Sequence, residues 1–423
     1  RFDEHTGGVE KFLVQGSGPL NGEVRISGAK NSALKLMAAS LLAEGSTSLT
    51  NVPEITDVAI MKELLEAMGV QVRREGQRVE IDVPSEIEPV APYSLVERMR
   101  ASIVVLGPLL ARIGRAKVAL PGGDDFGSRP IDMHLQGLEQ LGANFSYEHG
   151  DINGRADRLT GAEVFLEFPS VGATENLLMA AVLAEGTTVI ENAAREPEIS
   201  DLANFLSKMG SVIDGIGTSR LTIEGVPVLH PVSYEVIPDR IEAATYLAAV
   251  GVCGGELRLT GARSDHMEML LRKLEEMGME WQEDEDGLTA RVLERLQSVD
   301  VSTLPYPGLA TDYKPFLVAA LCVSQGAGMV TENIFAGRFR YIDELVRMGA
   351  EIRAEGRHAV VRGVARLSGA PVRAHDIRAG AALVVAGLAA DGETVISDAH
   401  HVDRGYEDLA GKLSSVGAQV KRI

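Results

Sequence analysis

The chain has 423 residues, of which 45% are hydrophobic and 24% are charged, and its formal net charge is −19. This length is more than one hydrophobic core usually serves, so we expect two or three domains. An acidic balance of this size disfavours nucleic acid and anionic membrane surfaces as partners.

The apolar segments are too short to cross a bilayer. Residues 379–390, among the longest, fall short of the roughly 20 residues that a spanning helix needs, and residues 1–9 are polar. We therefore expect a cytoplasmic protein. Its two cysteines, Cys253 and Cys322, lie in apolar runs and are expected to be core residues. Their number and spacing give neither a disulfide framework nor a metal motif.

Copies of one pattern follow each other along the chain. Each copy has an apolar run rich in small residues that ends near a glycine, then a short β-branched stretch, then an amphipathic segment that closes at a second glycine. The closing glycines are Gly69, Gly142, Gly210, Gly278, Gly349 and Gly417, spaced 68 to 73 residues apart. Such spacing indicates a repeated supersecondary unit, and six units divide naturally into two domains of three.

Each copy predicts one buried helix and one surface helix. The apolar runs end at Gly45, Gly114, Gly186, Gly254, Gly326 and Gly392. A helix that is apolar on all sides must be enclosed, and we expect each of these glycines to cap its helix. The stretches that follow, such as residues 187–190, are β-branched and predict strands. In residues 57–68 apolar residues recur with three-and-four spacing, which predicts a helix that covers a sheet.

Charged residues stand at or near the start of most of these apolar runs. They are Lys30, Arg100, Arg240, Asp312 and Arg378. The unpaired N–H groups and the dipole of a helix N-terminus attract anions. If the buried helices of a domain run parallel, these residues gather at one end and line a basic cleft in an acidic protein. Taken singly, each side chain is explained as well by an exposed cap or ion pair, but the recurrence favours the cleft.

Several segments resemble the UDP-N-acetylglucosamine 1-carboxyvinyltransferase family, and the resemblance covers about residues 11–423. The segments are SGAKNSA at 27–33, MRAS at 99–102, PGGDDFGSRPIDMH at 121–134, SVGATEN at 170–176, ENAAREPEI at 191–199, PDRIE at 238–242, Thr311-Asp312 and HVDRGYE at 401–407. The segment at 121–134 and the HVDRGYE motif are the most specific, whereas MRAS alone is a weak signal.

The resemblance implies an α+β fold of the enolpyruvyl-transferase type. In that fold six βαβαββ units form two domains of three around buried parallel helices, and the domains close on substrate. One domain then comprises residues 30–237 and carries a mobile catalytic loop at about residues 119–132. The other comprises residues 1–29 and 238–423 and carries the general base and the arginines that bind phosphate and carboxylate.

The resemblance also implies a reaction. The enolpyruvyl group of phosphoenolpyruvate passes to the 3′-hydroxyl of UDP-N-acetylglucosamine and phosphate is released, which is the first committed step of peptidoglycan synthesis. The partners are then two small molecules, and no cofactor, metal, nucleic acid, membrane or obligate protein partner is expected. Addition followed by elimination needs an acid, a base and cations for the anionic substrate.

The acid is the main departure from the family, which usually has a cysteine on the loop where this chain has Asp124. A carboxylic acid can donate the same proton if exclusion of water raises its pKa. Asp125 lies beside it, and the motif favours Asp124 as the acid. By the same resemblance the base is Asp312, for which a helix N-cap is the structural alternative.

Carried over residue by residue, the resemblance assigns the following roles. Catalysis falls to Asp124, Asp312, Lys30 and Arg404. Phosphoenolpyruvate binding falls to Lys30, Asn31, Arg129, Arg338, Arg378 and Arg404. UDP-N-acetylglucosamine binding falls to Asn31, Arg100, Arg129, Asp132, Ser170, Val171, Gly172, Thr311, Asp312 and Ile334. Arginine suits carboxylate and phosphate because its planar fork donates two hydrogen bonds, whereas Lys30 acts as a point charge.

Other departures and two alternatives stay open. Ala336-Gly337 stand before Arg338 where an acidic residue is expected, Leu309-Ala310 replace a common Phe-Pro, and Phe168 stands where some members have lysine. One alternative is a paralogous enolpyruvyl transferase whose acceptor is another nucleotide or shikimate 3-phosphate. The other is a catalytically silent homologue that binds nucleotide sugar.

Overall fold

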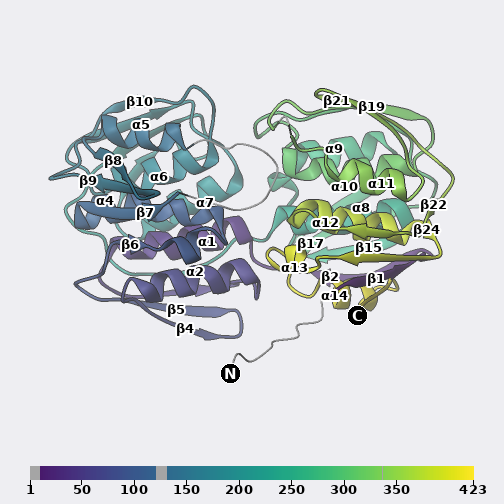
Figure 1. Ribbon diagram of the computed structural model, residues 1–423, viewed down its shortest axis with the longest axis horizontal. Helices are drawn as coiled ribbons and strands as arrows, with labels where there is room; N and C mark the ends of the chain where they lie inside the picture. The colour runs from purple at the N-terminus through teal and green to yellow at the C-terminus, as the bar shows by residue number, and fades with distance from the viewer. Residues whose placement is uncertain (1–9, 121–130, 336) are drawn as a thin grey trace. The chain divides into compact units, whose positions relative to one another are not determined.

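The computed structural model describes residues 10–120, 131–335 and 337–423 (Figure 1). These residues form two compact units. The 28–237 unit contains the described residues of that range, and the 238–423 unit contains the rest of the described chain, including residues 10–27. Each unit has a hydrophobic core of its own.

The sheets of the 28–237 unit share one topology, in which one pair of strands is parallel and the next two pairs are antiparallel. In sheet order the strands are β14 (Ser233–Glu235), β3 (Gly45–Thr50), β5 (Arg78–Val83) and β4 (Gln71–Glu75); β6 (Val90–Ala91), β7 (Arg115–Ala119), β9 (Asp151–Arg155) and β8 (Asn144–Glu148); and β10 (Glu163–Phe165), β11 (Thr187–Glu191), β13 (Arg220–Glu224) and β12 (Val212–Asp214).

The 238–423 unit repeats this topology. Its strands are β2 (Leu20–Arg25), β15 (Gly255–Thr260), β17 (Gly287–Val292) and β16 (Glu280–Asp284); β18 (Val301–Ser302), β19 (Ala327–Thr331), β21 (His358–Arg362) and β20 (Glu351–Glu355); and β23 (Pro371–Arg373), β25 (Glu393–Ser397), β1 (Phe12–Gln15) and β26 (Gln419–Arg422). A small separate sheet pairs β22 (Leu367–Ser368) with β24 (Ala390–Asp391). The repeat expected from the glycine spacing is therefore confirmed.

The helices are of two kinds, as the sequence predicts. The apolar ones are buried over most of their length: α1 (Lys30–Ala39), α4 (Leu106–Ile113), α6 (Val171–Ala181), α8 (Arg240–Cys253), α10 (Lys314–Cys322) and α12 (Ile377–Leu388). The amphipathic ones are α2 (Thr56–Ala67), α5 (Asp132–Gln140), α7 (Pro197–Lys208), α9 (Glu268–Glu276), α11 (Tyr341–Arg347) and α14 (Leu409–Ser415). Figure 1 shows the apolar helices inside each unit with sheets around them.

Short helical turns complete the described chain. They are α3 (Tyr93–Val96), α13 (His400–Asp403) and the 3-10 turns η1 (Ser40–Leu42), η2 (Arg100–Val105), η3 (Ser264–His266) and η4 (Thr311–Tyr313). Two of them, η2 and η4, lead directly into the buried helices α4 and α10. They therefore extend the apolar runs back to Arg100 and Thr311.

The closing glycines follow the amphipathic helices, and all of those named above have positive φ, between 88° and 115°. Glycine adopts this conformation without the steric penalty that a side chain would meet. The capping prediction for the buried helices holds for Gly114 and Gly254, which cap α4 and α8. It is wrong for the other four, because those helices end several residues earlier. Val182, for example, caps α6, and Gly186 turns the chain into β11.

The chain passes between the units at Ser27–Gly28 and again at Ile237–Pro238. In the 28–237 unit the Ala29 N–H donates to the Ile237 carbonyl at 2.7 Å. In the 238–423 unit the Asp239 N–H donates to the Ser27 carbonyl at 2.8 Å. These bonds hold the two crossing segments side by side.

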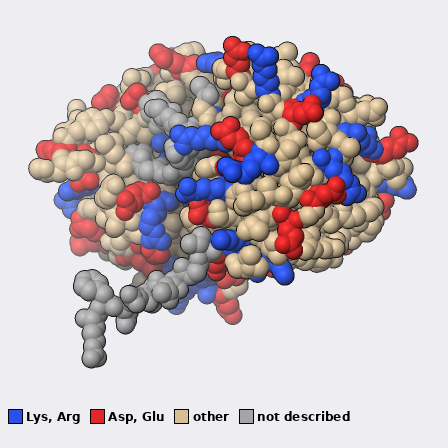
Figure 2. Space-filling model, turned by 45° about the vertical axis from the view of Figure 1, so that its right-hand side comes forward, with Lys and Arg blue, Asp and Glu red and all other residues tan. Residues whose placement is uncertain are grey.

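Three surface and core properties bear on the expectations from composition. Within the described ranges, no helix combines the length and the apolar character that crossing a membrane requires. On the face drawn in Figure 2, Lys and Arg side chains are interspersed with Asp and Glu side chains. Cys322 is buried and Cys253 half-buried, both as free thiols, and burial raises the pKa of each to about 12.

Candidate active site

Charged residues at the starts of the buried helices gather in the 238–423 unit, as predicted. Arg240 is the first residue of α8, Arg378 is the second of α12, and Asp312 lies in η4, just before α10. Enclosure by protein would raise the pKa of Asp312, but the guanidinium groups of Arg338, Arg378 and Arg240 outweigh it and hold that pKa well below its usual range. One carboxylate therefore faces three cations.

Asp312 bonds directly to Arg338. The Arg338 Nη2 donates to Asp312 Oδ1 at 2.9 Å, and the Arg338 Nη1 donates to Thr311 Oγ1 at 3.1 Å. The Arg338 side chain is 5% exposed, whereas Asp312 keeps 28% of its side-chain surface open to solvent. The N-cap alternative for Asp312 is not supported, since Tyr313 occupies the N-cap position of α10. The carboxylate is thus committed to the guanidinium rather than to the helix.

The Thr311 hydroxyl also donates to a buried carboxylate, Glu332 Oε2, at 2.8 Å. The other oxygen of Glu332 accepts a hydrogen bond from the Ile334 N–H at 2.8 Å. Thr311 and Ile334, both predicted to contact the nucleotide sugar, are therefore held by one side chain. Sequence reasoning did not single out Glu332.

Arg378 is buried, at 4% exposure, with its guanidinium carbon 5.5 Å from the Tyr406 ring centroid. Burial would lower its pKa, but Tyr406, Asp239 and Asp312 raise it, so the side chain stays charged. Its Nη1 has no hydrogen-bond partner among the described residues. A buried charged donor of this kind fits an anionic ligand.

Arg404, the remaining predicted cation of this unit, follows the last residue of α13 and is half-buried.

Asp376, two residues before Arg378, caps α12 by accepting hydrogen bonds from the N–H groups of Arg378 and Ala379. The cap fixes the backbone from which the Arg378 side chain extends.

In the 28–237 unit, Lys30 begins α1, and its Nζ lies 2.9 Å from Asp57 Oδ2 at the start of α2. Both side chains are nearly enclosed, at 11% and 1% exposure. Asn31 is half-buried, and its carbonyl accepts a hydrogen bond from Lys35 Nζ at 3.2 Å. The predicted cation at this helix start thus has a buried carboxylate partner.

The predicted residues Ser170, Val171 and Gly172 form the start of α6. Ser170 is the N-cap, and its Oγ accepts a hydrogen bond from the Ala173 N–H at 3.2 Å. A methyl group on Gly172 would lie 2.8 Å from His134 Cε1, so only glycine lets the ring approach this backbone. The first turn of α6 therefore offers its N–H groups next to a histidine.

His134 belongs to this region, although sequence reasoning gave it no role. Its Nδ1 lies 2.8 Å from the Asn176 side-chain nitrogen. Burial, then the charges of Arg100 and Lys35, lower its pKa to about 4. The imidazole is therefore neutral near pH 7, and since Asn176 donates to Nδ1, its proton resides on Nε2.

Arg100 and Asp132 stand at two further element starts of this unit. Arg100 begins η2 and is half-buried, and burial lowers its pKa. Asp132 begins α5 and is exposed. The predicted residues Asp124 and Arg129, together with Asp125, lie outside the described residues, as does most of the predicted loop at 119–132.

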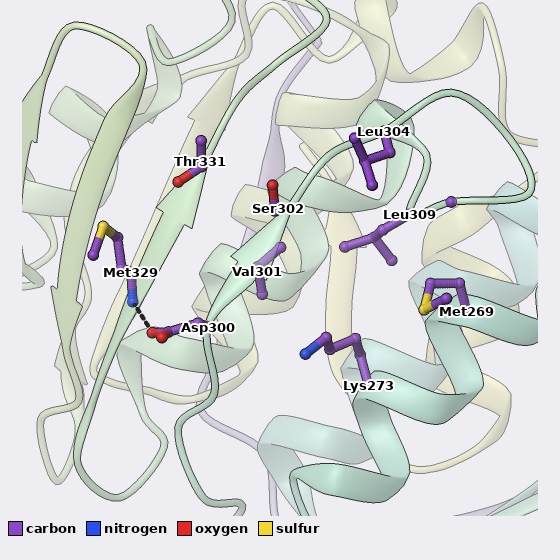
Figure 3. Close-up of a pocket in the computed structure, with 10 residues that line it drawn as sticks. Met269, Lys273, Asp300, Val301, Ser302, Leu304, Leu309, Met329 and Thr331 are labelled. Carbon is purple, nitrogen blue, oxygen red and sulfur yellow. Dashed lines mark hydrogen bonds between the residues drawn. The ribbon is translucent and has the colours of Figure 1, made fainter.

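A cavity of about 320 Å³ opens elsewhere in the 238–423 unit (Figure 3). Met269 and Lys273 of α9 line one side and Met329 and Thr331 of β19 the other, with Leu309 between them. None of the predicted site residues lines it. Within the described parts of the chain, no group of three or more His, Cys, Asp or Glu residues is arranged to hold a metal ion.

Comparison with known proteins identifies relatives over nearly the whole chain. The family model described as EPSP synthase (3-phosphoshikimate 1-carboxyvinyltransferase) matches residues 14–413. A UDP-N-acetylglucosamine 1-carboxyvinyltransferase of Nocardia farcinica is 52% identical over 420 residues, covering 98% of this chain and 99% of the relative. The enzyme of the same name from Mycolicibacterium paratuberculosis is 49% identical over 415 residues, covering 98% of this chain and 100% of the relative.

Among solved structures, the enolpyruvyl transferase NikO of Streptomyces tendae superposes with a TM-score of 0.89 at 26% identity, covering 98% of each chain. The fold expected from the motifs is thereby confirmed. The sixfold topology and the extent of these matches agree with one another. The chain therefore belongs to the EPSP synthase family and, within it, to the family of the UDP-N-acetylglucosamine 1-carboxyvinyltransferases.

Proposed function

We propose that this chain transfers the enolpyruvyl group of phosphoenolpyruvate to the 3′-hydroxyl of UDP-N-acetylglucosamine and releases phosphate, which is the first committed step of peptidoglycan synthesis. The names of relatives that share about half of the residues over nearly full length support the reaction and its acceptor. The observation that carries it in the structure is the cluster of Arg240, Arg338 and Arg378 around the Asp312 carboxylate.

The positively charged side chains of the proposed site match the negative charge of phosphoenolpyruvate. Its phosphate and carboxylate need several positive groups that are already in position before binding. Arg378 supplies a buried guanidinium with an unused donor, and Lys30 supplies an ammonium group at a helix start. We propose that Arg338, Arg404 and Asn31 complete this set, with Arg129 from outside the described residues.

We propose Asp312 as the base. The acceptor oxygen bonds to C2 of phosphoenolpyruvate, the hydroxyl proton passes to a carboxylate, and an acid delivers a proton to C3. Phosphate then leaves as C3 loses a proton and the enol double bond re-forms. A carboxylate whose pKa is held low by Arg338 is a weak base, so the Arg338 guanidinium must shift its hydrogen bond from Asp312 to the anionic substrate as the proton moves.

We propose that Asp124 is the acid and that the nucleotide sugar lies along the start of α6. The N–H groups of Val171 and Gly172, the Ser170 side chain and Arg100 are of the right chemistry for its oxygen atoms. Asp132, Thr311 and Ile334 are further proposed contacts. Because both substrates are cytoplasmic metabolites, we also propose that the protein acts in the cytoplasm, with these small molecules as its partners.

The decisive experiment measures phosphate release from phosphoenolpyruvate with each acceptor in turn. We expect release with UDP-N-acetylglucosamine, formation of its enolpyruvyl ether by mass spectrometry, and none with shikimate 3-phosphate. Release with a different nucleotide or with shikimate 3-phosphate alone would identify a paralogous transferase. Binding of UDP-N-acetylglucosamine without any acceptor-dependent release would identify a silent homologue.

A further inference from the structure

Lys314, the first residue of α10, is a buried cation for which the proposed reaction has no role. Its side chain has 0% exposure. The Nζ lies 2.7 Å from Glu332 Oε2, donates to the Arg338 carbonyl at 2.5 Å, and sits 3.9 Å from the centroid of the Phe339 ring. One ammonium group thus contacts both the Glu332 carboxylate and the Arg338 backbone.

Glu332 is equally enclosed, with 0% exposure, and binds the other segments of the site. Its Oε2 accepts a hydrogen bond from Thr311 Oγ1, and its Oε1 accepts hydrogen bonds from Thr303 Oγ1 at 2.7 Å and from the Ile334 N–H at 2.8 Å. The carboxylate therefore ties the Thr311–Asp312 turn to the segment that carries Ile334 and Arg338.

The start of α10 lacks the side-chain cap that the neighbouring helices α8 and α12 have. Asp239 and Asp376 cap α8 and α12 by accepting hydrogen bonds from backbone N–H groups. At α10 the N-cap residue Tyr313 makes no such bond. The aspartate of this region, Asp312, pairs with Arg338 instead.

Two buried charges are a poor means of adding stability, since removing them from water costs more than their attraction usually returns. Burial lowers the pKa of Lys314 to about 8, although Glu332 and Asp376 oppose this and Arg338 adds to it. The pKa of Glu332 is lowered, because Lys314, Thr303 and the Ile334 N–H outweigh its burial. Both groups are therefore charged near pH 7. Because such a buried ion pair adds little stability, its role is better explained by the geometry that it imposes on the residues it contacts.

We infer that Lys314 and Glu332 are positioning residues, which hold Ile334 and Arg338 at one fixed spacing from the Thr311–Asp312 turn. This rests on the proposed function, in which Asp312 and Arg338 meet the substrates. The pair itself touches no substrate. It acts by orienting groups that do, and small displacements of such groups lower rates steeply.

The test compares kcat, both KM values and the pH profile of wild type, Lys314→Met and Glu332→Gln. We expect each folded variant to lose about 100-fold in kcat with a smaller change in the KM of UDP-N-acetylglucosamine. In wild type, kcat should fall above about pH 8 as Lys314 loses its proton. Lys314→Met should lack this alkaline limb.

Lys412→Met is the control, because it breaks another Lys–Glu pair of the same unit, Lys412–Glu242 at 2.7 Å, in which the glutamate is buried and the lysine partly exposed. It should lose stability in urea and keep the wild-type kcat. Lys314→Met and Glu332→Gln with wild-type kcat and an unchanged alkaline limb would overturn the inference. If neither variant folds while Lys412→Met does, the pair belongs to stability and the inference also fails. Failure of the proposed function is seen separately, as a wild-type protein without acceptor-dependent phosphate release.

Discussion

The Asp312 carboxylate and the Arg338 guanidinium lie 2.9 Å apart, and only the carboxylate keeps a substantial exposed surface. A proposed base and a proposed substrate cation therefore neutralise each other before substrate binds. We predict that Asp312→Asn lowers kcat by at least about 100-fold, since a general base contributes at least that much. The rate of phosphate release from phosphoenolpyruvate at saturating UDP-N-acetylglucosamine measures kcat for both proteins.

The same substitution has a pH signature. The folded-state pKa of Asp312 lies below its unfolded value, so the stability that this carboxylate contributes is complete above about pH 5 and is lost as the pH falls below about 4. In urea unfolding, the free energy of unfolding of wild type should exceed that of Asp312→Asn at pH 7. This difference should shrink at low pH. The exposed control Asp286→Asn should match wild type in both assays. A constant difference at all pH values would contradict the lowered pKa.

A second prediction concerns the buried ion pair between Lys30 and Asp57. Removing one partner leaves the other charge buried without its counterion, which costs free energy of folding. Asp57→Asn should lower the free energy of unfolding by about 3 kcal/mol. The double variant Lys30→Met/Asp57→Asn should be more stable than Asp57→Asn, because no unpaired charge remains. Urea unfolding of the four proteins in the cycle checks this, and additive effects of the two changes would contradict the pairing.

A third prediction follows from two buried groups of the 28–237 unit whose pKa values move in opposite directions. Burial lowers the pKa of His134 to about 4 and raises that of Glu175 to about 7. Between pH 6.5 and about 4, His134 is protonated in the unfolded state but not in the folded state, so the protein loses stability as the pH falls through this range. Glu175 contributes stability at low pH that is lost as the pH rises through about 7.

Single variants should therefore tilt the stability profile in opposite senses. His134→Gln should gain stability relative to wild type as the pH falls from 6.5, by up to about 3 kcal/mol. Glu175→Gln should gain relative to wild type as the pH rises from about 5 to about 7. Urea unfolding at three pH values measures both slopes. Parallel slopes for the two variants would show that these groups do not titrate as described.

A fourth prediction concerns the proposed acid. Asp124→Asn should lower kcat by at least about 100-fold, because an amide cannot deliver the proton to C3. Nucleotide-sugar binding should persist. The epoxide antibiotic fosfomycin alkylates the loop thiol of family members, so it should leave the wild-type chain unmodified and modify Asp124→Cys. Mass spectrometry detects the adduct, and an adduct on the wild-type chain would contradict the assignment.

The repeat and the helix starts could be predicted from sequence because both rest on local patterns. The backbone conformation of Gly69 or Gly142 follows from a helix that must end there. The position of Lys30 and of Arg378 at the first turn of an apolar helix follows from burial, because a charged side chain can leave the apolar interior only at a helix end. Such features need no knowledge of which elements meet in space.

The missed features depend on pairings between distant elements. Glu332 reaches Thr311 and Lys314 from another part of the unit, and His134 meets Asn176 across two helices. One signal was available, since Lys314 interrupts an apolar run and a buried lysine requires a partner. The sequence contains no indication of which acid that partner is. The capping error at Gly186 has a local cause, because α6 ends at an ordinary residue before the turn.

The strand β1 has a consequence for synthesis on the ribosome. It is hydrogen-bonded between β25 and β26, which follow every other strand of the described chain. The 28–237 unit can close as soon as β14 emerges to pair with β3. The apolar strand around Phe12 and Val14 must therefore stay unpaired until β25 and β26 have been made. Nascent chains therefore carry an unpaired, aggregation-prone strand while the intervening residues are made, and a holdase that binds extended apolar segments would protect them.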